Sequence, residues 1–193
     1  FYRLSVDLND FFMNNLEILK ILSDWDTQEN RYVFTKQELG KLFSDKNQKT
    51  HTERLVRLVK AGILENPCRG IYFYPMARSR NSYLIEHIAK ALQKGSYNYL
   101  SLESMLSEYG VISQVPINHL NVMTTGRSAI YETPYGIIEF THTDRSPQDI
   151  LENTLLIQDR PLRIAKKNTA WRDLKRVGRN THLVNLEELN NED

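Results

Sequence analysis

The order of the elements predicted in residues 1–76 constrains the fold of this chain more than any other feature. Apolar residues recur there at intervals of three and four, which is the spacing of the buried face of a helix. The first run consists of Leu8, Phe11, Phe12, Leu16, Leu19 and Leu22. A polar stretch, Ser23–Arg31, separates this helix from a short predicted strand, "YVFT". Thr35 at the end of that strand is a candidate N-cap for a second helix that continues to Phe43.

A third helix is predicted from Asn47 to Ala61, and Gly62 is a plausible C-terminal stop. Its apolar side is formed by Leu55, Leu58 and Val59. Two short apolar segments follow, Ile63–Glu65 and Ile71–Tyr74, and the Pro67 and Gly70 between them are typical of a hairpin. Three helices and a hairpin in this order predict a winged helix-turn-helix, a fold that can place a helix in the major groove of DNA.

Charge on the third predicted helix favours the same interpretation. Segment 46–60 carries five basic residues against one acid, whereas the whole chain has a net charge of only +1. Arg, Gln and Thr side chains on such a helix can reach base edges and phosphates. The candidate DNA-binding residues are Lys46, Gln48, Lys49, Thr50, Thr52, Arg54, Arg57 and, in the hairpin turn, Arg69. The alternative is an ordinary solvated helix face, and some winged helices bind protein instead of DNA.

Residues 77–193 are expected to form a second, mixed α/β domain with a central, largely antiparallel sheet, so that the fold class is α+β. A helix that contains Leu84–Leu92 is predicted to end at Gly95, and a short helix runs from an N-cap at Ser101 to a stop at Gly110. From His119 onward apolar residues alternate with polar ones, which predicts strands. These strands are divided by a corner at Gly126 and by a turn at Pro134 and Gly136.

Five segments of the second domain occur in an order that resembles the AbiEi family of bacterial antitoxins. They read "YLSLESMLSEYGVI" with Pro116 following, "TTGR", "YETPYGIIEF", "PLRIA" and "AWRDL". One departure is "KKNTAWRDL", where the family commonly begins a helix with proline and an acidic residue. The resemblance implies a cytoplasmic antitoxin of a type IV toxin-antitoxin or abortive-infection system, without enzymatic activity or cofactor.

The resemblance also implies partners. The winged helix would repress its own promoter, at inverted repeats, as a monomer or a DNA-induced dimer. The C-terminal domain would counter a nucleotidyltransferase-like toxin, directly or through a shared target. The alternatives are a winged-helix module that binds only protein, and a Mg²⁺-dependent nuclease.

A second basic surface is predicted near the C-terminus. Within "NTAWRDLKRVGRN" an apolar stripe formed by Ala170, Trp171, Leu174 and Val177 lies beside a basic stripe. The candidate residues for a partner or second nucleic-acid surface are Arg127, Lys166, Lys167, Arg172, Lys175, Arg176 and Arg179. A docked helix with a solvated face explains the pattern equally well. Arg127 is expected to pair with Glu132 or Glu139. The acidic tail after Asn185 is expected to be frayed, and the alternative is that it folds back on the basic helix.

Catalytic and metal-binding patterns are weak. The sequence contains no GxxxxGK[ST] loop, GxSxG elbow or HExxH motif, and its single Cys68 excludes a Cys-rich zinc site. His119 and His142 could meet across a sheet, and Asp173 and Lys175 with Asp159 are the nearest approach to a nuclease site. Asp173 and Lys175 would point in different directions from one helix. No apolar run is long enough to span a bilayer, and no metal or cofactor site is predicted.

Overall fold

A computed structural model describes residues 4–43, 47–113 and 118–191, with side chains from Asn15 onward. The chain divides into two compact units, unit 1 (Phe1–Ser82) and unit 2 (Tyr83–Asp193). The described residues contain eight α-helices and two sheets, which confirms a mixed α+β fold. None of the described helices has the length and apolarity needed to cross a membrane. Leu8, Phe11, Phe12, Lys46 and Pro116, which the sequence singled out, lie outside the described side chains.

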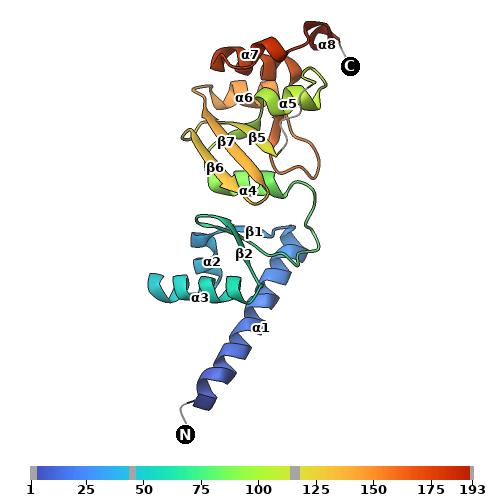
Figure 1. Ribbon diagram of the computed structural model, residues 1–193. Coiled ribbons are helices and arrows are strands. Elements are labelled where there is room, and N and C mark those ends of the chain that lie inside the picture. Colours follow the sequence, from blue (N-terminus) through green and yellow to red (C-terminus); the bar gives the residue numbers. More distant parts are fainter. Residues whose placement is uncertain (1–3, 44–46, 114–117, 192–193) are drawn as a thin grey trace. The chain divides into compact units, whose positions relative to one another are not determined.

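Unit 1 consists of three helices and a three-stranded antiparallel sheet (Figure 1). Its elements are α1 (Leu4–Glu29), β1 (Val33–Thr35), α2 (Lys36–Leu42), α3 (Gln48–Lys60), β2 (Glu65–Cys68) and β3 (Ile71–Phe73). The strand order is β1-β3-β2, so that the first strand pairs with the second arm of the hairpin. The last strand of unit 1, β3, is therefore the central strand of its sheet.

The first helix differs from the prediction in two respects. It continues through the polar stretch to Glu29, because one polar residue of that stretch is a buried anchor rather than a solvated one. The Asp26 carboxylate accepts hydrogen bonds from the backbone N–H groups of Arg78 and Ser79, at 2.7 and 3.1 Å. Leu16, assigned to the buried stripe, is 67% exposed, whereas Leu22 is fully buried.

The second and third helices begin where the sequence predicted. Thr35 and Glu38 form a reciprocal capping box at the start of α2, and the side chain of Asn47 caps α3. On α3 the buried side chains are those of His51, Leu55 and Leu58. Val59 is not one of them and is 36% exposed. His51 takes the third inward position, and its Nε2 lies 2.8 Å from the carbonyl oxygen of Lys36 on α2.

The hairpin is shifted along the chain from its predicted position. Its first strand is Glu65–Cys68 rather than Ile63–Glu65. This strand contains Pro67, which is tolerated because β2 lies at the edge of the sheet, where one side of the strand needs no hydrogen-bond donors. Ile63 and Leu64 precede the strand and are buried in the core.

Unit 2 is built on a six-stranded sheet with strand order β6-β7-β5-β4-β9-β8. Its strands are β4 (Asn98–Leu100), β5 (His119–Thr124), β6 (Ala129–Thr133), β7 (Gly136–His142), β8 (Thr154–Leu155) and β9 (Arg163–Ala165). Three pairings are antiparallel, but β4 pairs with β9 and β5 with β7 in parallel. The sheet is therefore mixed rather than largely antiparallel.

Helices cover both faces of this sheet. The helices of unit 2 are α4 (Leu84–Leu92), α5 (Leu102–Glu108), α6 (Pro147–Asn153), α7 (Lys167–Val177) and α8 (Leu186–Asn190), with a 3₁₀ turn at Thr181–Leu183. Figure 1 shows α4 on one side of the sheet and α5, α6 and α7 on the other. The sequence analysis missed strands β4, β8 and β9, because segments of two or three strand residues are too short to show an alternating pattern. It also missed α6, although Ser146 at the N-cap and Pro147 in the first turn are signals of a helix start.

Candidate functional site

The exposed side of α3 is the candidate nucleic-acid surface. The buried positions of α3 lie on one side of the helix, and a second set, whose successive members are three, one, three, one and three residues apart, lies on the opposite side. This outward face is formed by Lys49, Thr52, Glu53, Val56, Arg57 and Lys60, all of which are exposed. Among these residues three cations accompany one acid, so the outward face is basic.

Several other predicted DNA-binding residues are also exposed in unit 1. Gln48 and Thr50 lie in the first turn of α3, and Arg69 lies in the turn between β2 and β3, next to Gly70 with φ +83°. The Thr52 hydroxyl is partly committed within the unit, because it accepts a hydrogen bond from Lys36 Nζ at 2.8 Å. Lys46 belongs to the part of the chain that is not described.

Arg54 differs from the other predicted DNA-binding residues. Its side chain is half-buried, and Nη1 donates to the carbonyl oxygen of Phe43 at 3.5 Å, where α2 ends. The last carbonyl groups of a helix lack partners within the helix, and a guanidinium that supplies one stabilises the helix end. Arg54 was predicted to be an exposed DNA contact, and its position instead links α3 to the end of α2.

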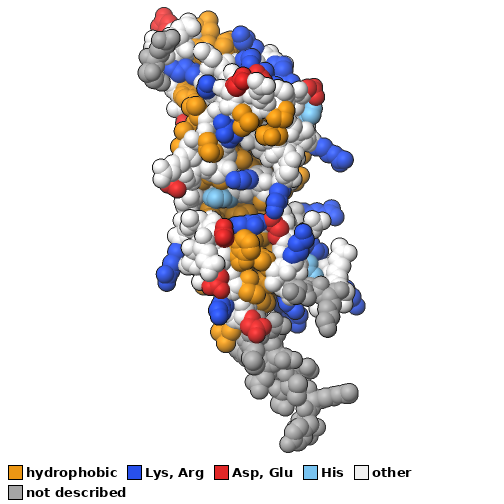
Figure 2. Space-filling view, turned by 180° about the vertical axis from the view of Figure 1, so that it is seen from behind, with side chains coloured by type: hydrophobic (Ala, Val, Ile, Leu, Met, Phe, Trp, Pro, Cys, Tyr) orange, Lys and Arg blue, Asp and Glu red, His pale blue; other side chains and the backbone are white. Residues whose placement is uncertain are grey.

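The basic residues of the chain are not concentrated in one surface patch. Figure 2 shows Lys and Arg side chains on the visible surfaces of both units, interspersed with acidic ones. In unit 2 many of the predicted basic residues bind acceptors within the unit. Lys166 Nζ donates to the carbonyl oxygen of Glu152 at 2.8 Å, and Lys167 Nζ donates to that of Asn191 at 2.7 Å.

The segment after Asn185 forms α8 and buries Leu189, so the expectation of a frayed tail is wrong for residues up to 191.

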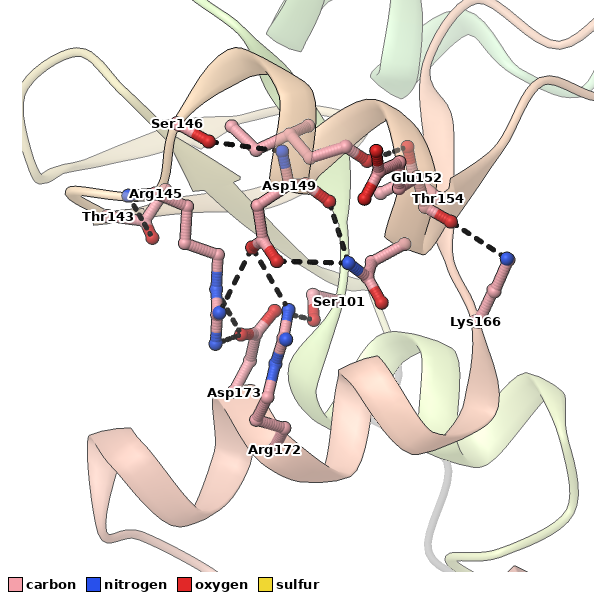
Figure 3. Close-up of polar contacts among 12 residues, drawn as sticks. Ser101, Thr143, Arg145, Ser146, Asp149, Glu152, Thr154, Lys166, Arg172 and Asp173 are labelled. Atoms are coloured by element: carbon pink, nitrogen blue, oxygen red, sulfur yellow. Dashed lines mark hydrogen bonds and ion pairs between the residues drawn. The ribbon is translucent and has the colours of Figure 1, made fainter.

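A buried carboxylate on α7 organises the first polar cluster of unit 2 (Figure 3). Asp173 is fully buried and accepts from Arg145 Nη2 and Nε at 2.9 and 3.2 Å. It also accepts from the hydroxyls of Ser101 at 2.8 Å and Tyr99 at 3.1 Å. Burial, together with the charge of Asp173, raises the pKa of Tyr99. Asp149 extends the cluster by accepting from Arg145 Nη1 at 3.1 Å and from Arg172 Nη2 at 3.3 Å.

This cluster corrects two sequence-based assignments. Ser101 does occupy the N-cap position of α5, but it makes no capping hydrogen bond, because its hydroxyl donates to Asp173. Arg172 was a candidate for a partner surface, and its guanidinium is instead bound to Asp149 within unit 2.

Arg179 organises a second polar cluster. It follows Gly178, which ends α7 with φ +75°, and its Nε donates to Glu103 Oε1 at 2.9 Å. Its Nη2 donates to Glu139 Oε2 at 3.0 Å and to Asn121 Oδ1 at 2.9 Å. Burial alone would raise the pKa of Glu139, but the hydrogen bonds and charges of Arg179 and His119 outweigh burial and lower it. Arg179 is therefore an internal cation of unit 2 rather than a surface candidate.

The remaining basic candidates of unit 2 lie on its surface. Arg127 was expected to pair with Glu132 or Glu139. Glu139 binds Arg179 and His119 instead, and among the described residues Arg127 forms no ion pair with Glu132 either. Arg127 is exposed, as are Lys175 and Arg176. Lys175 Nζ lies 5.1 Å from the centre of the Trp171 ring, and Arg176 Nη2 donates to the carbonyl oxygen of His142 at 2.8 Å.

Comparison with known proteins supports the fold and nothing finer. No protein-family model matches the chain, and no curated protein matches it. A crystal structure of the RV2827C protein from Mycobacterium tuberculosis is similar, with a TM-score of 0.56 and 12% sequence identity. The alignment covers 82% of this chain but only 59% of the other, so this chain spans less than two thirds of that protein. At this identity the likeness shows a shared fold alone.

The possible catalytic residues do not converge. Asp173 is buried in its ion pairs, whereas Lys175 and Asp159 are exposed. His119 and His142 occupy opposite ends of the β5–β7 pair, because His119 is opposite Ile137 and His142 is opposite Thr124. Within residues 4–43, 47–113 and 118–191, no three His, Cys, Asp or Glu side chains are grouped to hold a metal ion.

A pocket of about 340 Å³ beside α5 and β5 offers little for binding an anion. Its arginine, Arg160, is 8% exposed and already forms ion pairs with Glu86 and Glu108. Arg160 Nε donates to Glu86, and Nη1 and Nη2 donate to Glu108, so all three nitrogens of the guanidinium are already bound to carboxylates. The exposed basic surface of α3 is therefore the strongest functional feature that the structure presents.

Proposed function

We propose that this chain is a DNA-binding transcriptional repressor of the antitoxin class, and that unit 1 is a winged helix-turn-helix. The observation that carries the proposal is the outward face of α3, where Lys49, Arg57 and Lys60 are exposed together. Phosphates are bound by cations of this kind, and a helix with its basic side exposed can enter the major groove.

The connections within unit 1 support the same proposal. A winged helix has a short strand after its first helix, and that strand pairs with the second arm of the hairpin. Unit 1 has this order of elements, with strand order β1-β3-β2. In the proposal α3 is the recognition helix and the β2–β3 hairpin is the wing, whose tip carries the exposed Arg69. A basic wing tip would contact phosphates that flank the groove.

Unit 2 is proposed to be the antitoxin domain, which counters a nucleotidyltransferase-like toxin without catalysing a reaction. The support is the order of the "TTGR", "YETPYGIIEF" and "PLRIA" segments, which resembles AbiEi antitoxins. In the structure "TTGR" ends β5 and leads into β6, and its Gly126 N–H donates to Thr124 Oγ1 at 3.0 Å. A strand rather than a helix follows this arginine, so the segment builds the sheet and does not form a phosphate-binding loop.

Binding of the full chain to its own promoter tests the DNA-binding part of the proposal. We expect a mobility shift on the promoter duplex at protein concentrations that leave a random duplex of equal length unbound. Lys49→Ala with Lys60→Ala should weaken binding at least tenfold, by loss of two phosphate contacts. Lys20→Ala removes an exposed cation from α1 and should leave affinity unchanged. Equal binding to promoter and random duplexes would contradict a repressor and favour a protein-interaction module. Cleavage of the duplex in Mg²⁺ would favour the nuclease alternative.

A further inference from the structure

The centre of the outward face of α3 carries two side chains that cannot bind phosphate. Glu53 and Val56 lie three residues apart on the same side of the helix, between Lys49 at one end and Lys60 at the other. Val56 is 49% exposed and Glu53 is also exposed. A helix that enters the major groove directs its central outward residues at the base edges, while residues toward its ends and flanks reach the backbones.

Glu53 is the acid among the three cations of the outward face of α3. Within the described part of the chain its carboxylate forms no hydrogen bond or ion pair. A carboxylate that faces a polyanion is repelled by it and lowers its general affinity. At the centre of a groove-facing helix the same group can accept a hydrogen bond from the N4 amino group of cytosine.

Val56 is the apolar neighbour of Glu53 on this face. Single exposed apolar residues are common on protein surfaces, so exposure by itself has no meaning. The position of Val56 is more informative, because the buried residues His51, Leu55 and Leu58 lie on the other side of the helix. An apolar side chain at the centre of a groove-facing helix can pack against the 5-methyl group of thymine.

We propose that Glu53 and Val56 are the base-reading residues of α3, with Glu53 accepting from cytosine and Val56 packing on an adjacent thymine methyl. This assignment rests on the proposed DNA binding by α3 and adds its sequence readout. The surrounding cations, Lys49, Arg57 and Lys60, then supply affinity that does not depend on sequence.

A duplex selected from a random library by the full-length wild-type protein provides the probe. Each thymine of the selected duplex is replaced in turn by deoxyuridine, which removes only the 5-methyl group. For the wild-type protein we expect one position at which the replacement weakens binding about fourfold, the value of one buried methyl group. Val56→Ala should bind the thymine duplex about fourfold more weakly and should be insensitive to deoxyuridine at that position. Val59→Ala, on the same helix but 36% exposed at the edge of the face, should keep the wild-type response.

Glu53→Gln tests the second half of the assignment. Loss of the negative charge should tighten binding to random duplex, while the affinity ratio of selected to random duplex should fall about tenfold. Three results would overturn the assignment. They are wild-type binding that no deoxyuridine changes, a Val56→Ala protein as sensitive as wild type, and a Glu53→Gln protein with an unchanged ratio. If the wild-type protein selects no duplex at all, the proposed function fails first and the assignment fails with it.

Discussion

Replacement of Asp173 by alanine should be among the most destabilising single changes in unit 2. The carboxylate is fully buried and accepts four hydrogen bonds, from Arg145, Ser101 and Tyr99. Its removal leaves the Arg145 guanidinium, whose side chain is 19% exposed, without its main counter-ion. Removal of one partner from a buried ion pair typically costs about 3–5 kcal/mol, and we expect about 4 kcal/mol here.

Asp149→Ala provides the matched control for this prediction. Asp149 binds the same Arg145 guanidinium, but its side chain is 33% exposed, so solvent screens the interaction. We expect a loss of about 1 kcal/mol for this variant, as for a partly exposed ion pair. The comparison therefore tests whether burial, rather than the count of contacts with Arg145, sets the cost.

Urea unfolding followed by tryptophan fluorescence measures both variants. Trp171 lies on α7 beside Asp173, so a Trp25→Phe background makes the signal report unit 2 alone. With a slope of about 2 kcal/mol per M, the Asp173→Ala midpoint should fall by about 2 M and the Asp149→Ala midpoint by about 0.5 M. Equal shifts for the two variants, or a shift below 0.5 M for Asp173→Ala, would refute the assignment of Asp173 as a buried structural charge.

Two further predictions concern charges in unit 2. Arg179→Ala should destabilise unit 2 by about 2–4 kcal/mol and raise the pKa of Glu139, because Glu103 and Glu139 lose their shared counter-ion. The control is Arg127→Ala, which changes an exposed residue and should cost less than about 0.5 kcal/mol in the same urea titration. Burial lowers the pKa of His87 from 6.5 to about 4. At pH values between 6.5 and about 4, the imidazole of His87 is protonated in the unfolded chain but neutral in the folded protein. Protonation therefore favours unfolding, and His87 should lower the free energy of unfolding by about 3 kcal/mol as the pH falls from 7 to 4. A His87→Gln protein should lack this part of the stability loss at low pH. A free energy of unfolding that depends on pH in the same way in the variant and the wild type would contradict the account.

Much of unit 1 could be predicted from sequence because its signals are local. Capping at Thr35 and Asn47 and the periodic apolar residues of α3 act within a few residues of the chain. The errors arose where a distant contact decides the outcome. Asp26 extends α1 because residues 78 and 79 donate to it, and Val59 is exposed because His51 fills the inward position.

The polar interior of unit 2 was hidden from sequence analysis for the same reason. Ser101 and Glu103 have the identity and spacing of a helix start, yet both bind residues more than 70 positions away. Likewise the basic stripe of residues 172–179 is typical of a surface, but two of its four cations, Arg172 and Arg179, are bound to acids within unit 2. A charge pattern on one helix does not indicate whether an acid from another helix or strand lies opposite, so surface candidates from such patterns need a structure.

The salt dependence of promoter binding tests the central claim, that the outward face of α3 binds DNA phosphates. Each phosphate contact contributes about 0.9 to the slope of log affinity against log salt concentration. We predict that Lys49→Ala with Lys60→Ala reduces the magnitude of that slope by about 1.8 relative to wild type, while Lys20→Ala leaves it unchanged. Identical slopes and affinities for the wild-type and double-variant proteins would show that α3 does not face the DNA, and would contradict the account.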